Sequence, residues 1–269
     1  MKRNELSRRK DGFRKAGLRA TMPSSLPFEI HLEDARGAVL ALHGYTGGPS
    51  DLRYLAGRLA AAGFAVSVPR LPGAGTDMDD LSNTSRRDWM RRAIDTWEDL
   101  RSRYKTVSIL GYSMGGLLAL ELARMVKSEK TVLLAPALIT SHKSMRFLPL
   151  LRPLAGVLPK MKTGWEPKDE DSEERREHGR RYWAYRDLKS AAQLSLLQSE
   201  VLKHLGGIRT PVMAVVSSED MTVPAKVLKL LEKRLPSGLS ATLVVTKCGH
   251  NIPQGPDQEK VADAVIAWL

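Results

Sequence analysis

The sequence has almost none of the features that build a disulfide framework or a membrane span. Cys248 is the one cysteine among 269 residues, which excludes a disulfide within the chain and fits a reducing compartment. No stretch reaches the roughly 18 consecutive apolar residues that a membrane-spanning helix requires. The basic N-terminal segment also lacks the apolar run of a secretion signal. We therefore expect a cytoplasmic protein.

Several motifs that would indicate a bound partner or cofactor are also absent. No G-x-G-x-x-G follows the first expected strand, and no phosphate-binding P-loop occurs, which argues against a dinucleotide or nucleotide enzyme. His, Cys and carboxylate residues show no metal-ligand spacing. The chain also lacks a helix-turn-helix, a zinc ligand set and an aromatic RNA-binding signature. We expect no metal, no cofactor and no nucleic-acid partner.

Positive charge is concentrated at the start of the chain. The formal net charge is +12, and residues 1–20 contribute half of it, with eight Lys or Arg residues against two acidic ones. We interpret residues 1–26 as a basic N-terminal arm. Two interpretations of this arm stay open. It is either a solvated arm or short helix, or a segment that associates weakly with an acidic partner or an anionic membrane surface.

The rest of the chain alternates short apolar runs with amphipathic segments. The apolar runs predict strands, most of them buried on both faces, and they fall at residues 28–32, 38–42, 64–68, 107–110, 131–134, 212–216 and 241–245. Helical spacing is found between them, at residues 50–62, 89–103, 115–127, 224–235 and 257–269. Strands that alternate with helices of this length indicate parallel βαβ units. The expected fold class is therefore α/β, with a mostly parallel central sheet flanked by helices.

The alternation is interrupted once. Residues 136–207 show no clear strand, contain a mixed-charge segment and predict a helix over 188–205. We therefore divide the chain into a core, residues 27–135 and 208–269, and an insertion, residues 136–207. The insertion also holds a leucine-rich stretch in which Leu150 and Leu154 could line an acyl pocket. These leucines could equally form the insertion's own core.

Ser113 is the candidate nucleophile. It lies in the pattern G-x-S-x-G, at residues 111–115, between an expected buried strand and an expected helix. A serine on such a sharp turn is lifted clear of the sheet, and the backbone there is strained. The two glycines remove side chains that would otherwise collide across the turn. The helix that follows presents free backbone N–H groups beside the serine.

A serine hydroxyl needs a base, and the base needs an orienting carboxylate. Among the six histidines, His250 follows the last expected strand, at the carboxyl edge of the sheet where parallel sheets bind ligands. Asp220 follows the preceding strand at the same edge. The chain order Ser113, Asp220, His250 matches one of the known triad arrangements. Glu219, beside Asp220, remains the alternative acid.

Acyl transfer also requires hydrogen-bond donors for an oxyanion. The residue after the nucleophile, Met114, is expected to supply one backbone N–H. The glycine-rich loop after the strand at 38–42 is expected to supply the second. We choose Tyr45 as that donor and keep Thr46 as the alternative. His43 ends the strand and more plausibly supports this loop than acts as a base.

Taken together, these residues resemble the α/β-hydrolase superfamily, and within it the bacterial carboxylesterase and monoacylglycerol lipase group. The matching stretches are residues 43–47, 111–116, 220–224 and 249–250. The resemblance implies an α/β-hydrolase fold, Ser113, Asp220 and His250 as a triad, and Tyr45 and Met114 as oxyanion donors. It also implies that residues 136–207 form a helical cap over the site. One departure is Gly73-Ala74-Gly75, where relatives often have Gly-His-Gly.

The function expected from this pattern is serine-dependent cleavage of carboxylic esters through an acyl-enzyme. The substrates would be small-molecule esters, either short- to medium-chain acyl esters or monoacylglycerols. Two alternatives stay open. The chain could be a non-catalytic member of the fold that binds a small molecule, or it could hydrolyse another acyl bond, namely a thioester, an amide or a C–C bond.

Overall fold

A computed structural model describes residues 20–141, 161–169 and 171–269 of the chain. Its core is a seven-stranded sheet in the order β1-β3-β2-β4-β5-β8-β9. The strands are β1 (Phe28–Ile30), β2 (Gly37–Leu42), β3 (Phe64–Val68), β4 (Val107–Tyr112), β5 (Thr131–Leu134), β8 (Val212–Ser217) and β9 (Ala241–Val245). All neighbouring strands pair in parallel except β1, which runs antiparallel to β3. The α/β fold with a mostly parallel sheet is confirmed.

The central strands are apolar along their whole length because both of their faces are covered. Every residue of β2, β3, β4, β5 and β8 is buried, whereas the edge strand β9 alternates between half-buried and exposed positions up to its last residue, Val245, which is buried. The register pairs Leu42 with Gly111 and Tyr112 with Leu134. The loops that follow β2, β4 and β5 therefore leave the sheet side by side at its carboxyl edge.

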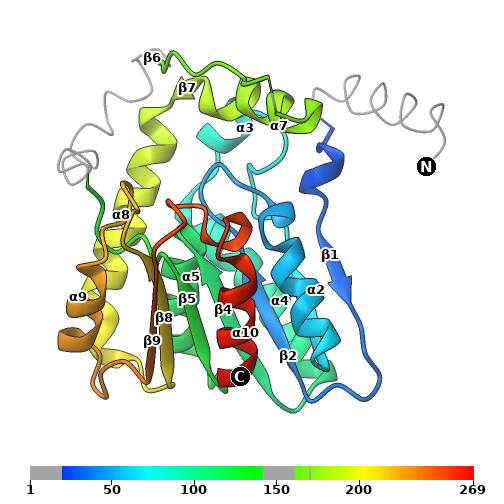
Figure 1. Cartoon of the computed structure of the whole chain (residues 1–269), viewed down its shortest axis with the longest axis vertical. Coiled ribbons are helices and arrows are strands. Elements are labelled where there is room, and N and C mark those ends of the chain that lie inside the picture. Colours follow the sequence, from blue (N-terminus) through cyan, green and yellow to red (C-terminus); the bar gives the residue numbers. More distant parts are fainter. Residues whose placement is uncertain (1–19, 142–160, 170) are drawn as a thin grey trace.

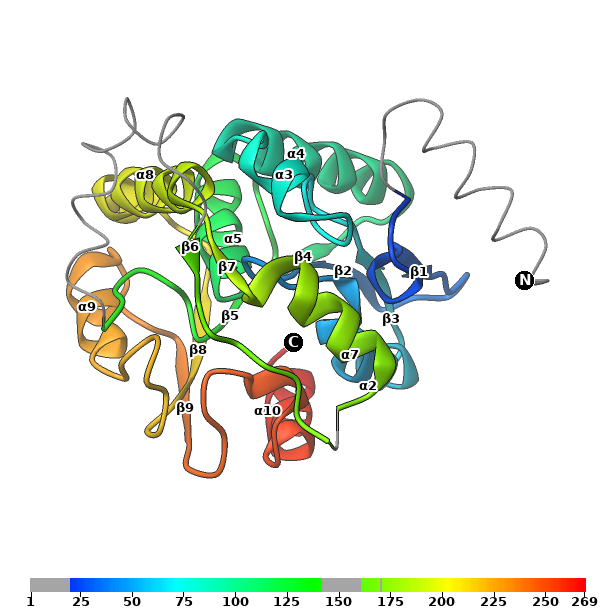
Figure 2. The same ribbon diagram turned by 90° about the horizontal axis from the view of Figure 1, so that it is seen from above.

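Helices cover the two faces of the sheet (Figure 2). One face packs against α4 (Arg86–Arg103), α5 (Met114–Met125), α8 (Leu188–His204) and α9 (Val227–Arg234). The other face packs against α2 (Arg53–Ala61) and α10 (Gln258–Trp268). Figure 1 shows α10 and α2 in front of the strands and α4 behind them. Because helices pack on both faces, the strands are held in place, and so are the starting points of the loops at their carboxyl ends.

The segment between β5 and β8 interrupts this alternation, as expected. Its described part holds α7 (Glu173–His178), a π-helical turn (Gly179–Trp183), α8 and a two-stranded ribbon, β6 (Met161–Lys162) with β7 (Tyr185–Arg186). The expectation of no strand here was wrong, because strands of two residues are too short to show a period of two. Figure 1 shows α7 and the ribbon beyond the upper end of the sheet, together with α3 (Met78–Ser82).

Two groups of predicted residues fall partly or wholly outside the described residues. Leu150 and Leu154, the expected acyl-wall leucines, lie outside them, and so does most of the basic segment 1–26. The described end of that segment packs on the core. Met22 and Ser25 are buried, and the Met22 N–H donates to the carbonyl of Gly75 at 2.7 Å. No helix in the described part of the chain is long and apolar enough to cross a membrane.

Candidate active site

Ser113 stands on a strained turn between β4 and α5. Its φ of 54° and ψ of −113° lie outside the conformations that L residues usually adopt. The flanking glycines are required by close packing: a Cβ at Gly111 would overlap the carbonyl of Gly115, and one at Gly115 would overlap the carbonyl of Leu42. The sharp strand-turn-helix expected from the G-x-S-x-G pattern is therefore present, and it presents the serine at the carboxyl edge of the sheet.

The structure brings Ser113, His250 and Asp220 into one hydrogen-bonded series. His250 Nε2 lies 2.9 Å from Ser113 Oγ, and His250 Nδ1 lies 2.7 Å from Asp220 Oδ2. An ionised carboxylate only accepts, so Nδ1–H donates to Asp220 and Nε2 is left to accept the serine proton. His250 comes from the loop after β9 and Asp220 from the loop after β8. This geometry can deprotonate the serine during an attack.

The carboxylate of Asp220 is fixed at both of its oxygens. Its side chain is fully buried, and Oδ1 accepts the backbone N–H groups of Thr222 at 2.7 Å and Val223 at 2.9 Å. Burial alone would raise the pKa of Asp220, but the hydrogen bonds from His250 and from these N–H groups outweigh it, and the pKa lies below its ordinary value. Glu219, the alternative acid, is exposed. Asp220, rather than Glu219, contacts His250.

The loop after β2 lies directly beside Ser113. A Cβ at Gly44 would be 3.4 Å from the Ser113 Cβ. His43 holds this loop through two hydrogen bonds. Its Nε2 accepts the N–H of Leu71 at 3.1 Å, so the ring proton is on Nδ1, which donates to the Gly44 carbonyl at 2.9 Å. Complete burial lowers the pKa of His43 to about 4. His43 is therefore a neutral support of the loop, as the sequence suggested.

Fixing the Gly44 carbonyl also fixes the direction of the next N–H. In a trans peptide the C=O and the N–H point in opposite directions, so the Tyr45 N–H points away from His43. The Gly44 carbonyl is held a second time, by the Gly47 N–H at 3.2 Å. Among the described residues, the N–H groups of Tyr45 and Met114 donate to no backbone acceptor. The roles of Tyr45 and Met114 as oxyanion donors, which require such uncommitted N–H groups, stay predictions.

The inserted segment contributes contacts that the sequence did not reveal. The Tyr45 hydroxyl lies 2.6 Å from Ser190 Oγ of α8, and His178 Nε2 of α7 lies 2.6 Å from the Thr46 carbonyl oxygen. His178 therefore makes a tertiary contact from the inserted segment to this loop. The N-cap of α7, a serine followed by two glutamates, could have indicated the helix. Nothing in the sequence pattern could have indicated its partner.

The loop at residues 73–75 is also held by the inserted segment. Gly73 and Gly75 adopt φ values of 80° and 74°, and Ala74 between them is buried. The Tyr182 hydroxyl donates to the Gly73 carbonyl at 2.8 Å and accepts the Thr76 N–H at 2.7 Å. A tyrosine from the insertion thus ties down the 73–75 loop. Among the described residues, no group of three or more His, Cys, Asp or Glu could hold a metal ion.

Two known proteins are similar to part of this chain. A stretch of 94 residues is 39% identical to a thermostable monoacylglycerol lipase of Bacillus sp. (strain H-257), and it covers 35% of this chain and 38% of that protein. A stretch of 110 residues is 34% identical to a carboxylesterase of Bacillus subtilis, and it covers 40% of this chain and 45% of that protein. The aligned part thus spans less than half the length of either relative.

Solved structures share the fold over nearly the whole chain. A structure from work on LipS and LipT, two metagenome-derived lipolytic enzymes, has a TM-score of 0.78 at 22% identity and covers 93% of this chain and 98% of that one. The monoacylglycerol lipase of Paleococcus ferrophilus has a TM-score of 0.70 at 21% identity, with coverages of 90% and 97%. The model of the "Alpha/beta hydrolase family" matches residues 39–264. The chain belongs to the alpha/beta hydrolase family.

Proposed function

We propose that this protein is a serine hydrolase that cleaves carboxylic esters through an acyl-enzyme. The observation that carries the proposal is the unbroken series from Ser113 Oγ to His250 Nε2, at 2.9 Å, and from His250 Nδ1 to Asp220 Oδ2, at 2.7 Å. A base within hydrogen-bond reach of the nucleophile, itself oriented by a carboxylate, is the arrangement that activates a serine hydroxyl. The lipase and esterase names of the two Bacillus relatives support the same chemistry.

Acylation follows from the geometry. Ser113 Oγ attacks the ester carbonyl carbon while His250 Nε2 takes the hydroxyl proton, and Asp220 stabilises the imidazolium that forms. The carbonyl oxygen becomes an oxyanion that accepts the N–H groups of Tyr45 and Met114. When the tetrahedral intermediate collapses, the C–O bond to the alcohol breaks and His250 returns the proton to the leaving oxygen. The product is an ester of Ser113 and a free alcohol.

Deacylation uses the same groups with water as the nucleophile. His250 Nε2 removes a proton from the water, whose oxygen attacks the acyl carbon of the Ser113 ester. The second tetrahedral intermediate is stabilised by the same two N–H groups and releases a carboxylic acid as the proton passes to Ser113 Oγ. No group other than those in the described site is needed. We therefore expect neither a metal nor a cofactor.

The substrate class we propose is short- to medium-chain acyl esters or monoacylglycerols. We further propose that residues 136–207 form a cap over the site. The contacts of α7 and α8 with the loop that carries Tyr45 and Thr46 support this role. Leu150 and Leu154 remain the predicted acyl wall of that cap. A reducing, cytoplasmic location is proposed on the strength of the single thiol, which is buried at Cys248.

Hydrolysis of p-nitrophenyl esters from acetate to laurate tests the proposal. We expect turnover of the butyrate and hexanoate, and a loss on the order of 10⁶ in kcat for Ser113→Ala, as for nucleophile removal in serine proteases. Ser199→Ala is the matched control, because within the described part of the chain its hydroxyl donates only to the Ser195 carbonyl, in α8 itself. A fluorophosphonate should label Ser113 in the wild type and leave the Ser113→Ala variant unlabelled.

The same assay separates the alternatives. A folded wild-type protein that hydrolyses no ester and takes up no fluorophosphonate would be a non-catalytic member of the fold. Labelling without ester turnover would indicate that another acyl bond, such as a thioester or an amide, is the substrate. Equal activity in Ser113→Ala and in Ser199→Ala would remove Ser113 from the mechanism.

A further inference from the structure

The loop that carries the expected oxyanion donor Tyr45 is held by two side chains from the inserted segment. Ser190 of α8 contacts the Tyr45 hydroxyl, and His178 of α7 contacts the Thr46 carbonyl, both at 2.6 Å. The two contacts come from helices 145 and 132 residues away along the chain. The two contacts are made to adjacent residues of the loop whose N–H is expected to face the substrate carbonyl.

The contact between Tyr45 and Ser190 is half-buried, with Ser190 on its buried side. Ser190 is fully buried in the first turn of α8, where the Asp187 side chain caps its N–H at 2.7 Å. The Tyr45 ring packs edge-on against Trp89, with 6.4 Å between the ring centroids. Burial raises the pKa of the Tyr45 phenol far above neutral pH, so the hydroxyl keeps its proton and can share it with Ser190. Tyr45 is thereby fixed at both its ring and its hydroxyl.

The His178 contact has a defined direction. A carbonyl oxygen only accepts, so His178 Nε2–H donates to Thr46. The imidazole is enclosed by Tyr182 and Trp183, each with a ring centroid 5.0 Å away. Burial lowers the pKa of His178, which favours the neutral ring with its proton on Nε2. The ring is therefore held in the orientation that this hydrogen bond requires.

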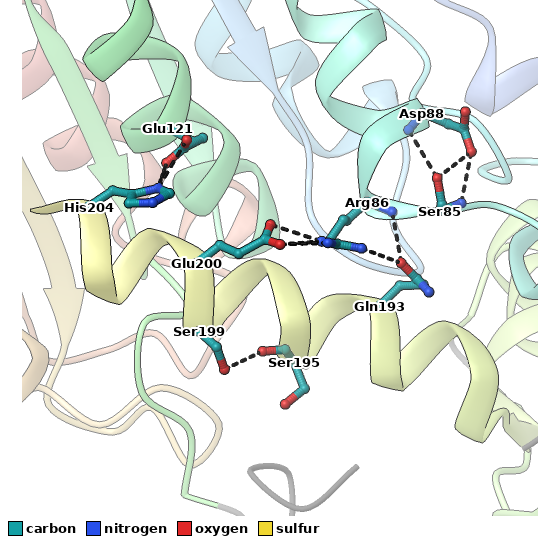
Figure 3. Close-up of polar contacts among 9 residues, drawn as sticks. All are labelled: Ser85, Arg86, Asp88, Glu121, Gln193, Ser195, Ser199, Glu200 and His204. Carbon is teal, nitrogen blue, oxygen red and sulfur yellow. Dashed lines mark hydrogen bonds and ion pairs between the residues drawn. The ribbon is translucent and has the colours of Figure 1, made fainter. Parts of the chain in front are cut away.

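Helix α8, which carries Ser190, is itself bonded to the core helices α4 and α5 (Figure 3). Arg86 at the start of α4 donates to both carboxylate oxygens of Glu200 on α8, at 2.6 to 2.8 Å. Further along α8, His204 contacts Glu121 of α5 at 3.0 Å. Helix α5 begins directly after Ser113, and α8, which carries Ser190, is bonded to α5. The same pair of packed helices therefore positions both the nucleophile and Ser190. Their relative positions are therefore fixed.

The loop needs this support because its backbone is not in a favoured conformation. Thr46 has a φ of 54°, in the left-handed region that residues with a Cβ rarely adopt. We propose that Ser190 and His178 are positioning residues that hold the Tyr45–Thr46 backbone in the orientation that stabilises the oxyanion. This inference rests on the proposed function, since it assumes an oxyanion on the substrate of Ser113.

The inference predicts which kinetic constant changes. The Tyr45 N–H bonds more strongly to the oxyanion than to the ground-state carbonyl, so a misdirected loop lowers kcat and leaves KM nearly constant. Losing one positioning hydrogen bond should lower kcat about two- to tenfold. The affinity for phenylboronic acid, whose adduct with Ser113 carries a tetrahedral oxygen, should fall by the same factor.

Ser190→Ala and Tyr45→Phe test the first contact from its two ends, with Ser199→Ala as the matched control on α8. We expect both test variants to lower kcat for p-nitrophenyl butyrate and to weaken phenylboronic acid. The double variant should be no slower than the slower single one, because both remove the same hydrogen bond. If Ser190→Ala does not fold, Tyr45→Phe still reports the contact. Wild-type kcat in both, or losses that multiply in the double variant, overturns the inference.

His178→Gln and His178→Leu test the second contact. The Gln amide can donate from nearly the same reach as Nε2, so it should retain kcat, whereas Leu should lower it. A Leu variant with unchanged kcat, or a Gln variant as slow as Leu, overturns this part. Failure of the proposed function looks different: wild-type protein then neither turns over the ester nor binds phenylboronic acid. With an active wild type, only the positioning role is at stake.

Discussion

At the scale of single residues, the orientation of His250 depends on which atoms Asp220 has left to offer. Oδ1 of Asp220 is already occupied by the N–H groups of Thr222 and Val223, so Oδ2 alone faces His250. A substitution that keeps the shape and removes the charge therefore has a defined outcome. The amide oxygen of an asparagine would take the position of Oδ1, and its NH₂ group would point at His250 Nδ1.

Asp220→Asn should consequently lower kcat by about 10⁴, because the NH₂ group would donate to Nδ1 and leave the ring proton on Nε2, where it blocks proton transfer from Ser113. Glu219→Gln is the matched control and should retain wild-type kcat, since Glu219 is exposed. Steady-state hydrolysis of p-nitrophenyl butyrate measures both. A large loss in the Glu219 variant with an active Asp220 variant would reverse the assignment of the two acids.

His43 makes a prediction about stability and pH. Its pKa is about 4 in the folded protein against an ordinary value of 6.5. Between pH 4 and pH 6.5, His43 is protonated in the unfolded chain but neutral in the folded protein. The free energy of unfolding is therefore highest above pH 6.5 and decreases as the pH falls toward 4. The free energy of unfolding should drop by about 2 kcal/mol from pH 7 to pH 5 on account of this residue.

Urea unfolding of wild type and His43→Asn at pH 7 and pH 5 measures this contribution. The asparagine can still donate to the Gly44 carbonyl but does not titrate. The difference in unfolding free energy between the two proteins should therefore be smaller at pH 5. A difference independent of pH would mean that His43 is not held neutral by burial. Other titrating groups affect both proteins alike and cancel.

The individual site residues differ in how far the sequence could define them. Ser113, Asp220 and His250 each follow an apolar run, and parallel strands bring such positions to one edge, so their proximity could be predicted. Ser190 and His178 could not be predicted, because their contacts depend on how an insertion folds back over the sheet. Neither the spacing nor the periodicity of residues in the sequence indicates such long-range contacts.

At the scale of elements, α8 connects the core to the loop that carries Tyr45 and Thr46. Its polar contacts with α4 and α5 lie along one side of the helix, as Figure 3 shows. Arg86 is the main anchor, because its guanidinium binds Glu200 with two nitrogens and its backbone N–H donates to Gln193 at 3.3 Å. Its side chain is only 18% exposed, so solvent screens this pair less than an ordinary surface ion pair.

Arg86→Ala should destabilise the protein by about 1 kcal/mol, the upper range for partly exposed ion pairs with good geometry. Arg92→Ala on the same helix, where the side chain is exposed, should change the unfolding free energy by less than about 0.5 kcal/mol. Urea unfolding monitored by tryptophan fluorescence compares the two. Equal stabilities would show that packing of α8, rather than this ion pair, fixes it to the core.

Elements were predictable in proportion to their length and burial. The strands at 64–68, 131–134 and 241–245 have the expected bounds, because apolar runs between turn residues define both ends. The ribbon at 161–162 and 185–186 and the six-residue α7 were missed. Such short elements carry too few residues for a period, and their stability comes from tertiary contacts that the local sequence does not show.

At the scale of the whole molecule, much of the positive charge lies in a part of the sequence that holds none of the candidate catalytic residues. Residues 1–20 hold half of the net charge of +12. Ser113, Asp220 and His250 lie at the carboxyl edge of a sheet that begins at Phe28. The basic segment supplies none of the groups in the hydrogen-bonded series. Its removal can therefore be expected to change where the protein binds without changing how it turns over a soluble ester.

Deleting residues 2–19 tests this separation and keeps Met22 and Ser25, which are buried against the core. We expect kcat for p-nitrophenyl butyrate to stay within about twofold, because the deletion leaves every interaction of the described site in place. Full-length protein should cosediment with vesicles of phosphatidylglycerol and phosphatidylcholine at low salt, since each basic residue near an anionic surface is worth about 1 kcal/mol. The shortened protein should remain in the supernatant.

The salt dependence of this binding is the decisive control. Screening at 1 M salt reduces the Debye length to about 3 Å, so vesicle binding of the full-length protein should be lost there. Vesicles of phosphatidylcholine alone should bind neither protein. Binding that survives high salt, or equal binding by both proteins, would locate the membrane contact on the core instead. A large loss of kcat in a folded, shortened protein would show that the basic segment acts on the site.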